Sequence, residues 1–123
     1  MSNISQIEEK LYSKNKSVRL KALKLMLKHP DSTSLQLIKC LCSSDNRNFE
    51  FFKIFELEKA MHAAWDRIKG VTDESIYIYL TDFYKQDEQA NFSLVEHILL
   101  KIDTKKAAEQ LQIIKNRKEA GKN

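Results

Sequence analysis

The residues that most often bind metals or act as nucleophiles are few in this chain and widely spaced. Its three histidines, His29, His62 and His97, lie far apart, and its two cysteines, Cys40 and Cys42, are separated by one residue. None of these spacings matches the Cys-x-x-Cys or His-x-x-x-His patterns of structural zinc sites. On a helix, Cys40 and Cys42 point about 200° apart and cannot form a disulfide with each other. We therefore predict no metal site and two reduced thiols.

The sequence does not indicate an enzyme. His62 and His97 could act as general bases only beside a nucleophile or a positioned carboxylate, and neither lies in such a motif. Glu96 adjoins His97, but on a helix it points about 100° away. The chain has two glycines, Gly70 and Gly121, which are too few for a dinucleotide-binding or phosphate-binding loop. We predict no catalytic residue and no cofactor.

Basic residues are concentrated early in the chain, where residues 10–30 hold seven Lys or Arg side chains and no acid. Several of these lysines share one face of a predicted helix or lie just before it. This Lys face consists of Lys14, Lys16, Lys21, Lys24 and Lys28. It could bind an acidic protein or the phosphates of a nucleic acid, and a solvated helix face is the plainer interpretation. No aromatic residues alternate with the lysines, which argues against stacking on bases.

A second candidate surface surrounds an aliphatic residue that faces away from the predicted core. Ile78 lies opposite the apolar stripe of its helix, beside Thr81 and Lys85, in a segment that also carries several tyrosines. An exposed isoleucine beside a tyrosine is a possible anchor for a protein partner. We treat Tyr77, Ile78 and Lys85 as a possible contact patch, with a single exposed apolar residue as the alternative. Residues 71–100 are acidic, with six acids and one lysine.

The elements that position these residues are predicted to be helices throughout. Apolar residues recur at helical spacing between short polar turns, and most of the abundant residue types favour helix. We predict an all-α fold of about seven helices, in helix–turn–helix pairs, forming a short right-handed solenoid or a compact bundle. Trp65 lies on an apolar stripe and is predicted to be structural, and Gly70 is predicted to end that helix. The predicted N-caps include Asp31 or Ser32, Thr72, Ser93, and Asp103 or Thr104.

Arg19 is unusual because it falls inside the apolar face of its helix. It needs a carboxylate or carbonyl partner, or must extend along its stem to solvent, and we predict a structural role for it. The segment 11–28, with Val18, Arg19, Ala22 and Met26, resembles a HEAT repeat around its second helix. Asn15 stands where that family has an aspartate. A weak internal repeat accompanies the resemblance: Ile7, Leu11, Ser13 and Asn15 match Leu37, Leu41, Ser43 and Asp45.

The HEAT resemblance implies an interaction scaffold that binds partners on a concave face lined by the second helix of each pair. We therefore expect a non-enzymatic protein-binding module: an adaptor, an inhibitor, or a neutraliser of the immunity or antitoxin type. The alternative is a nucleic-acid-associated protein that contacts phosphates through the Lys face. Residues 1–117 are predicted to form one domain and residues 118–123 a frayed tail. The polar, acidic start and the lack of a long apolar run predict a cytoplasmic protein without a membrane segment.

Overall fold

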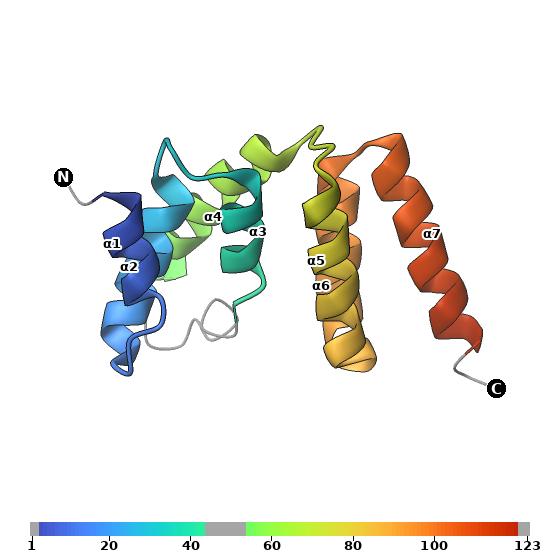
Figure 1. The fold of residues 1–123 in the computed structure, drawn as a ribbon, viewed down its shortest axis with the longest axis horizontal. Helices are drawn as coiled ribbons and strands as arrows, with labels where there is room; N and C mark the ends of the chain where they lie inside the picture. Colours follow the sequence, from blue (N-terminus) through green and yellow to red (C-terminus); the bar gives the residue numbers. More distant parts are fainter. Residues whose placement is uncertain (1–2, 44–53, 121–123) are drawn as a thin grey trace. The chain divides into compact units, whose positions relative to one another are not determined.

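The computed structural model describes residues 3–43 and 54–120, and of residues 54–58 only the backbone (Figure 1). The described residues form seven α-helices and no strand, which confirms the all-α prediction. The segment 76–80, which is strand-like by residue type, is helical. The helices are α1 (Ile4–Lys10), α2 (Lys16–Lys28), α3 (Ser34–Leu41), α4 (Ile54–Ile68), α5 (Glu74–Gln86), α6 (Glu88–Ile102) and α7 (Lys105–Ala120).

The chain packs as two compact units, Met1–Arg67 and Ile68–Asn123. Each unit has its own buried side chains and is described by itself below. The boundary falls at the end of α4, where no Pro-rich or Ser-rich linker signals it in the sequence. That residues 1–117 form one domain stays a prediction.

In the first unit, α1 packs on α2, and α2 packs on α3. Helix α2 buries five of its side chains, because its apolar residues cover more than half of its circumference. Trp65 on α4 is 8% exposed, as predicted for a core tryptophan. The buried residues of the first unit include Ile7, Leu20, Ala22, Leu23, Met26, Leu27, Leu37, Ile38, Leu41, Ala60 and Ala64.

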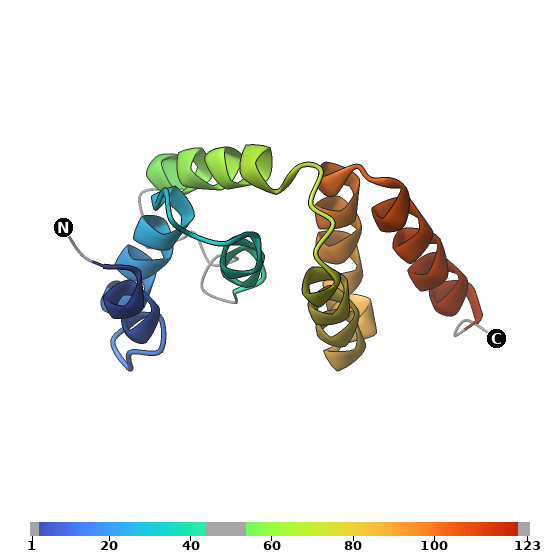
Figure 2. The same ribbon diagram turned by 45° about the horizontal axis from the view of Figure 1, so that its top comes forward.

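In the second unit, α5, α6 and α7 pack against one another (Figure 2). The hairpin of α5 and α6 is the more apolar part. Helix α7 inserts only Ala107, Leu111 and Ile114 into the core, one residue per turn of the helix. The remaining buried residues of the unit include Ile68, Ile76, Tyr77, Leu80, Phe83, Tyr84, Val95, Ile98, Leu99 and Ile102.

The N-cap of α3 differs from the predicted one. Thr33 caps the helix in a capping box with Gln36: the Gln36 N–H donates to Thr33 Oγ1 (3.1 Å), and the Thr33 N–H donates to Gln36 Oε1 (2.9 Å). Asp31 lies outside the helix, and Ser32 is buried with its hydroxyl donating to the Met26 carbonyl (2.6 Å). These two hydrogen bonds satisfy the backbone N–H groups of both Thr33 and Gln36, which explains why Thr33 caps the helix rather than Asp31 or Ser32.

Aspartates cap α5 and α6, where the sequence predicted the hydroxyl groups of Thr72 and Ser93. Asp73, not Thr72, caps α5 by accepting from the Ser75 N–H (3.0 Å). Asp87 caps α6 by accepting from the Ala90 N–H (3.1 Å), so α6 begins well before Ser93, which lies inside the helix. A carboxylate is favoured at such positions because it also interacts with the positive end of the helix dipole.

The two remaining boundary predictions agree with the structure. Gly70 follows α4 with φ +80°, a conformation in which a side chain would be strained, and its N–H donates to the Ile102 carbonyl (2.8 Å). Thr104 caps α7, because its Oγ1 accepts from the Ala107 N–H (3.0 Å).

Two further predictions concern ends of helices. Helix α7 continues to Ala120, so residues 118–120 of the predicted tail are helical, and fraying of that tail stays a prediction. The exposed Lys118 ammonium lies 3.8 Å from the centroid of the Phe92 ring on α6, which helps to hold this last turn. The apolar spacing predicts that the fourth helix begins near residue 48. That start, and Asp45 of the internal repeat, lie outside the described residues.

Candidate protein-binding surface

The turn that precedes the Lys face is fixed by Arg19 and Asn15. Arg19 is half-buried, and its Nη1 donates to the carbonyl oxygens of Ser13 (2.9 Å) and Lys14 (3.1 Å), so carbonyl groups are among its partners. Asn15 caps α2, with its Oδ1 accepting from the Ser17 N–H (2.9 Å). The amide thus does the capping at a position where an aspartate would serve equally well.

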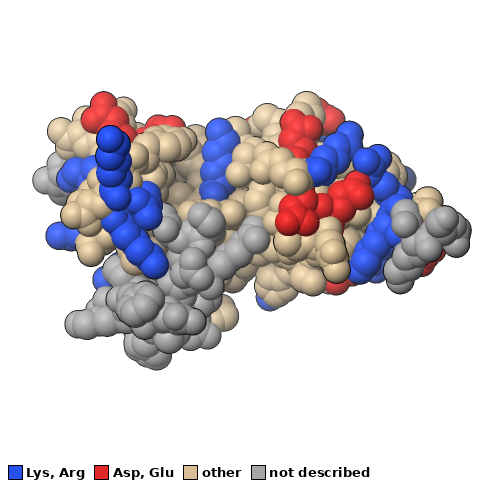
Figure 3. All heavy atoms as spheres, turned by 90° about the horizontal axis from the view of Figure 1, so that it is seen from below, with Lys and Arg blue, Asp and Glu red and all other residues tan. Residues whose placement is uncertain are grey.

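The Lys face lies along one side of α2, a helix that contains no acidic residue. Lys14, Lys21 and Lys28 are exposed, and the other two lysines of the face are half-buried. Leu25 is 39% exposed and lies one turn from both Lys21 and Lys28. Basic side chains are prominent over the helices of the first unit on the face drawn in Figure 3. The sequence therefore located an exposed basic surface but missed the leucine within it.

The predicted contact patch is only partly at the surface. Ile78 is 56% exposed and Lys85 is exposed, but Tyr77 is 2% exposed, so its side chain contributes almost no surface to the patch. The Tyr77 hydroxyl donates to the Val71 carbonyl (2.8 Å) and lies 3.0 Å from Thr104 Oγ1. Tyr77 therefore ties the segment before α5 to the start of α7, which is a structural role.

A hollow of about 160 Å³ lies between α5 and α7, with Ile78 at its edge. The Gln110 side chain on α7 donates from Nε2 to Thr81 Oγ1 on α5 (2.6 Å) and forms part of its wall. Glu74 and Asp82 lie one turn to either side of Ile78, and both are exposed. The hollow is lined by Glu74, Tyr77, Ile78, Thr81, Asp82 and Gln110. This combination places one aliphatic side chain between two carboxylates beside a recess.

Helix α7 pairs with most of the acidic groups of the α5–α6 hairpin. Lys106 pairs with Glu74, Lys115 with Glu96 (3.6 Å), and Arg117 with Glu88. The hydrogen bond to Glu88 raises the pKa of Arg117. Lys106 also lies 5.0 Å from the centroid of the Tyr77 ring. Asp73 and Asp87 cap helices, so within the described residues Asp82 is the acid of α5 that is left without a charged or hydrogen-bonding partner.

The histidines do not come together in a site. His29 Nδ1 accepts from the Asp31 N–H (3.1 Å) beside α2, and His62 and His97 are exposed on α4 and α6. In the parts of the chain that the structure describes, no three His, Cys, Asp or Glu side chains are placed so that they could hold a metal ion. Burial, together with the nearby Glu8 carboxylate, raises the pKa of the Cys40 thiol from 9.0 to about 12.

Cys40 and Cys42 are buried and form no disulfide, and we predict that neither reacts with a water-soluble disulfide reagent at pH 8 while the chain is folded. Both should react at the rate of a small thiol once denaturant unfolds the chain. Because the folded pKa of Cys40 lies above its unfolded value, its contribution to stability is complete below about pH 9 and is lost as the pH rises toward 12. Rapid modification of the folded protein would contradict this prediction.

Comparison with known proteins yields no match: no family model, no curated protein and no solved structure is significantly similar to this chain. Across residues 3–43 and 54–120, every helix is too short or too polar to cross a membrane.

Proposed function

We propose that the chain is a non-enzymatic protein-binding module whose docking surface is the face of α5 and α7 around Ile78. The observation that carries this proposal is an exposed aliphatic side chain at the edge of a recess, with a carboxylate one turn away on either side. Such an arrangement offers an apolar anchor point inside a polar rim, which is the usual anatomy of a protein interface. A HEAT-like scaffold of paired helices remains part of the proposal, as does a cytoplasmic location suited to reduced, buried thiols.

A selection from a library of displayed random peptides tests this surface. Peptides are enriched on the full-length chain and then compared on two variants, Ile78→Asp and Leu100→Asp. Leu100 is the matched control because it is 60% exposed on α6 and lines a different hollow, of about 120 Å³, with Glu96 and Asp103 one turn to either side. We expect a group of peptides whose affinity falls at least about tenfold, or about 1.4 kcal/mol, on the Ile78→Asp variant. The affinity of the same peptides for the Leu100→Asp variant should be unchanged. Equal behaviour on both variants would reject the Ile78 surface.

The second candidate function is binding of nucleic-acid phosphates by the Lys face, and the exposure of Lys14, Lys21 and Lys28 on and beside a helix without acids favours it. Five phosphate contacts would give a slope of about −4 to −5 in a plot of log affinity against log salt for duplex DNA. DNA binding with that salt dependence, weakened by Lys21→Gln, is the result that would put this candidate first.

A further inference from the structure

Two exposed ridges of this chain have the same layout and opposite charge. On α5, the acidic ridge consists of Glu74, Ile78 and Asp82, at successive turns of the helix. On α2, the basic ridge consists of Lys21, Leu25 and Lys28, also at successive turns. All six residues are exposed, so each ridge presents one aliphatic side chain between two like charges. The two ridges belong to different compact units.

We propose that the basic ridge of one copy of the chain docks on the acidic ridge of a second copy, so that the protein associates with itself. The inference rests on the proposed function, because it uses the Ile78 surface and names its partner. The complementarity is specific in spacing: Leu25 would meet Ile78 and the α5–α7 hollow, while the flanking lysines meet the flanking carboxylates.

The charges available for this contact differ at its two ends. Asp82, Lys21 and Lys28 form no ion pair with any residue that the structure describes, so all three can pair with a second copy. Glu74 already pairs with Lys106 and would share its carboxylate. The ridge contact therefore depends mostly on the lysine that reaches Asp82 and on the burial of Leu25 against Ile78.

Sedimentation velocity of the full-length chain at low and high salt tests the association. The contact is small and partly electrostatic, so we expect the weight-average mass to rise above 14.4 kDa between about 10 μM and 1 mM at low ionic strength. It should return to the monomer value at about 0.5 M salt, where charges on the surface are screened. A chain that stays monomeric up to about 1 mM at low salt would overturn the proposal.

A charge-exchange experiment tests the pairing itself. The first variant carries Lys21→Glu and Lys28→Glu, and the second carries Glu74→Gln and Asp82→Lys. Each variant alone should be monomeric because its two ridges no longer carry opposite charges. An equimolar mixture should associate again, because the changed ridge of each variant complements a ridge of the other. Far-UV circular dichroism establishes that both variants are folded.

The control variant carries Lys69→Glu and Lys105→Glu, which change the net charge by the same amount as the first variant does, at exposed positions outside both ridges. It should associate as the unchanged chain does. Association that survives Leu25→Asp and Ile78→Asp, or a mixture that stays monomeric, would reject the ridge contact. Peptides that depend on Ile78, found together with a monomeric chain, would reject self-association and leave the proposed docking surface standing.

Discussion

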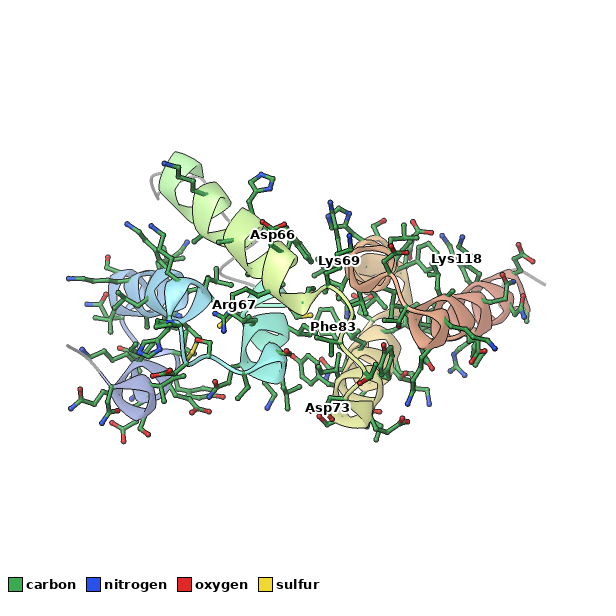
Figure 4. All side chains as sticks on the ribbon, turned by 90° about the horizontal axis from the view of Figure 1, so that it is seen from above. Asp66, Arg67, Lys69, Asp73, Phe83 and Lys118 are labelled. Atoms are coloured by element: carbon green, nitrogen blue, oxygen red, sulfur yellow. The ribbon has the colours of Figure 1, made fainter. Side chains whose placement is uncertain are left out.

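Replacing Arg67 with methionine should lower the free energy of unfolding by about 2 kcal/mol. The guanidinium donates from Nη1 to the His29 carbonyl (2.7 Å) and from Nη2 to the carbonyls of Ser32 (2.7 Å) and Pro30 (3.3 Å). Figure 4 shows the side chain reaching from α4 toward the connection between α2 and α3. Methionine keeps the stem but leaves these carbonyl oxygens without their charged donor. Two of the three bonds are exposed, so water offsets part of the loss.

Denaturant unfolding followed by circular dichroism measures this loss. Lys69→Met is the matched control, because it removes an exposed cation two residues away and should change stability by less than about 0.5 kcal/mol. Arg67→Lys should recover only part of the stability, since an ammonium cannot span three carbonyls as a planar fork does. If Arg67→Met lowers the free energy of unfolding no more than Lys69→Met does, then hydrogen bonds to water replace the three bonds with no loss of stability.

The same variant has a local consequence. Arg67 holds the connection that leads into α3, so its loss should lower hydrogen-exchange protection of the amides in α3 more than of those in α6. A uniform fall across both helices would mean that the contact stabilises the whole chain rather than this connection.

Two arginines bind carbonyl oxygens of connections between helices, and the sequence revealed only one of them. Arg19 falls on the apolar face of its own helix, so periodicity alone required a partner nearby, and the partners are five and six residues away. Arg67 is exposed, and its acceptors are 35 to 38 residues away. Helical spacing carries no information about such a contact, because it depends on how α4 packs against the connection.

The helices themselves were predictable because their signals are local. Strong apolar periodicity located all seven, whereas their first residues depended on competition between neighbouring capping groups. Ser93 has the spacing of a capping box, yet Asp87 begins α6 six residues earlier because a carboxylate accepts from the Ala90 N–H there. Sequence spacing cannot rank two possible caps on one segment when either start leaves the same apolar face buried.

For the candidate surface, the sequence predicted the exposure of Ile78 but not the burial of Tyr77. Ile78 lies opposite the apolar stripe of α5, so its exposure followed from the helical wheel. Tyr77 lies beside that stripe, and its burial depends on α7, which brings Thr104 to its hydroxyl. The hollow also depends on α7 through Gln110. Asp82 could have been recognised, because it lies one turn after Ile78 as Glu74 lies one turn before it.

Two conservative substitutions on α5 should differ in their effect on the free energy of unfolding. Tyr77→Phe should lower the free energy of unfolding by about 1–2 kcal/mol, because it removes a hydroxyl that donates to the carbonyl of the half-buried Val71 and contacts Thr104. Tyr84→Phe should leave stability unchanged or raise it by up to about 1 kcal/mol. The Tyr84 hydroxyl is buried without a hydrogen-bond partner, although the ring packs edge-on against Phe92 at 6.3 Å between centroids.

The pair is a controlled comparison, since each change removes one oxygen atom from a buried tyrosine of the same helix. Thermal and denaturant unfolding of both variants, with equal denaturant dependence, gives the two differences directly. A loss with Tyr84→Phe as large as that with Tyr77→Phe would show that a bound water satisfies the Tyr84 hydroxyl in solution. No loss with Tyr77→Phe would show that the bond to Val71 contributes nothing, and that apolar burial of Ala107, Leu111 and Ile114 is enough to hold α7 in place.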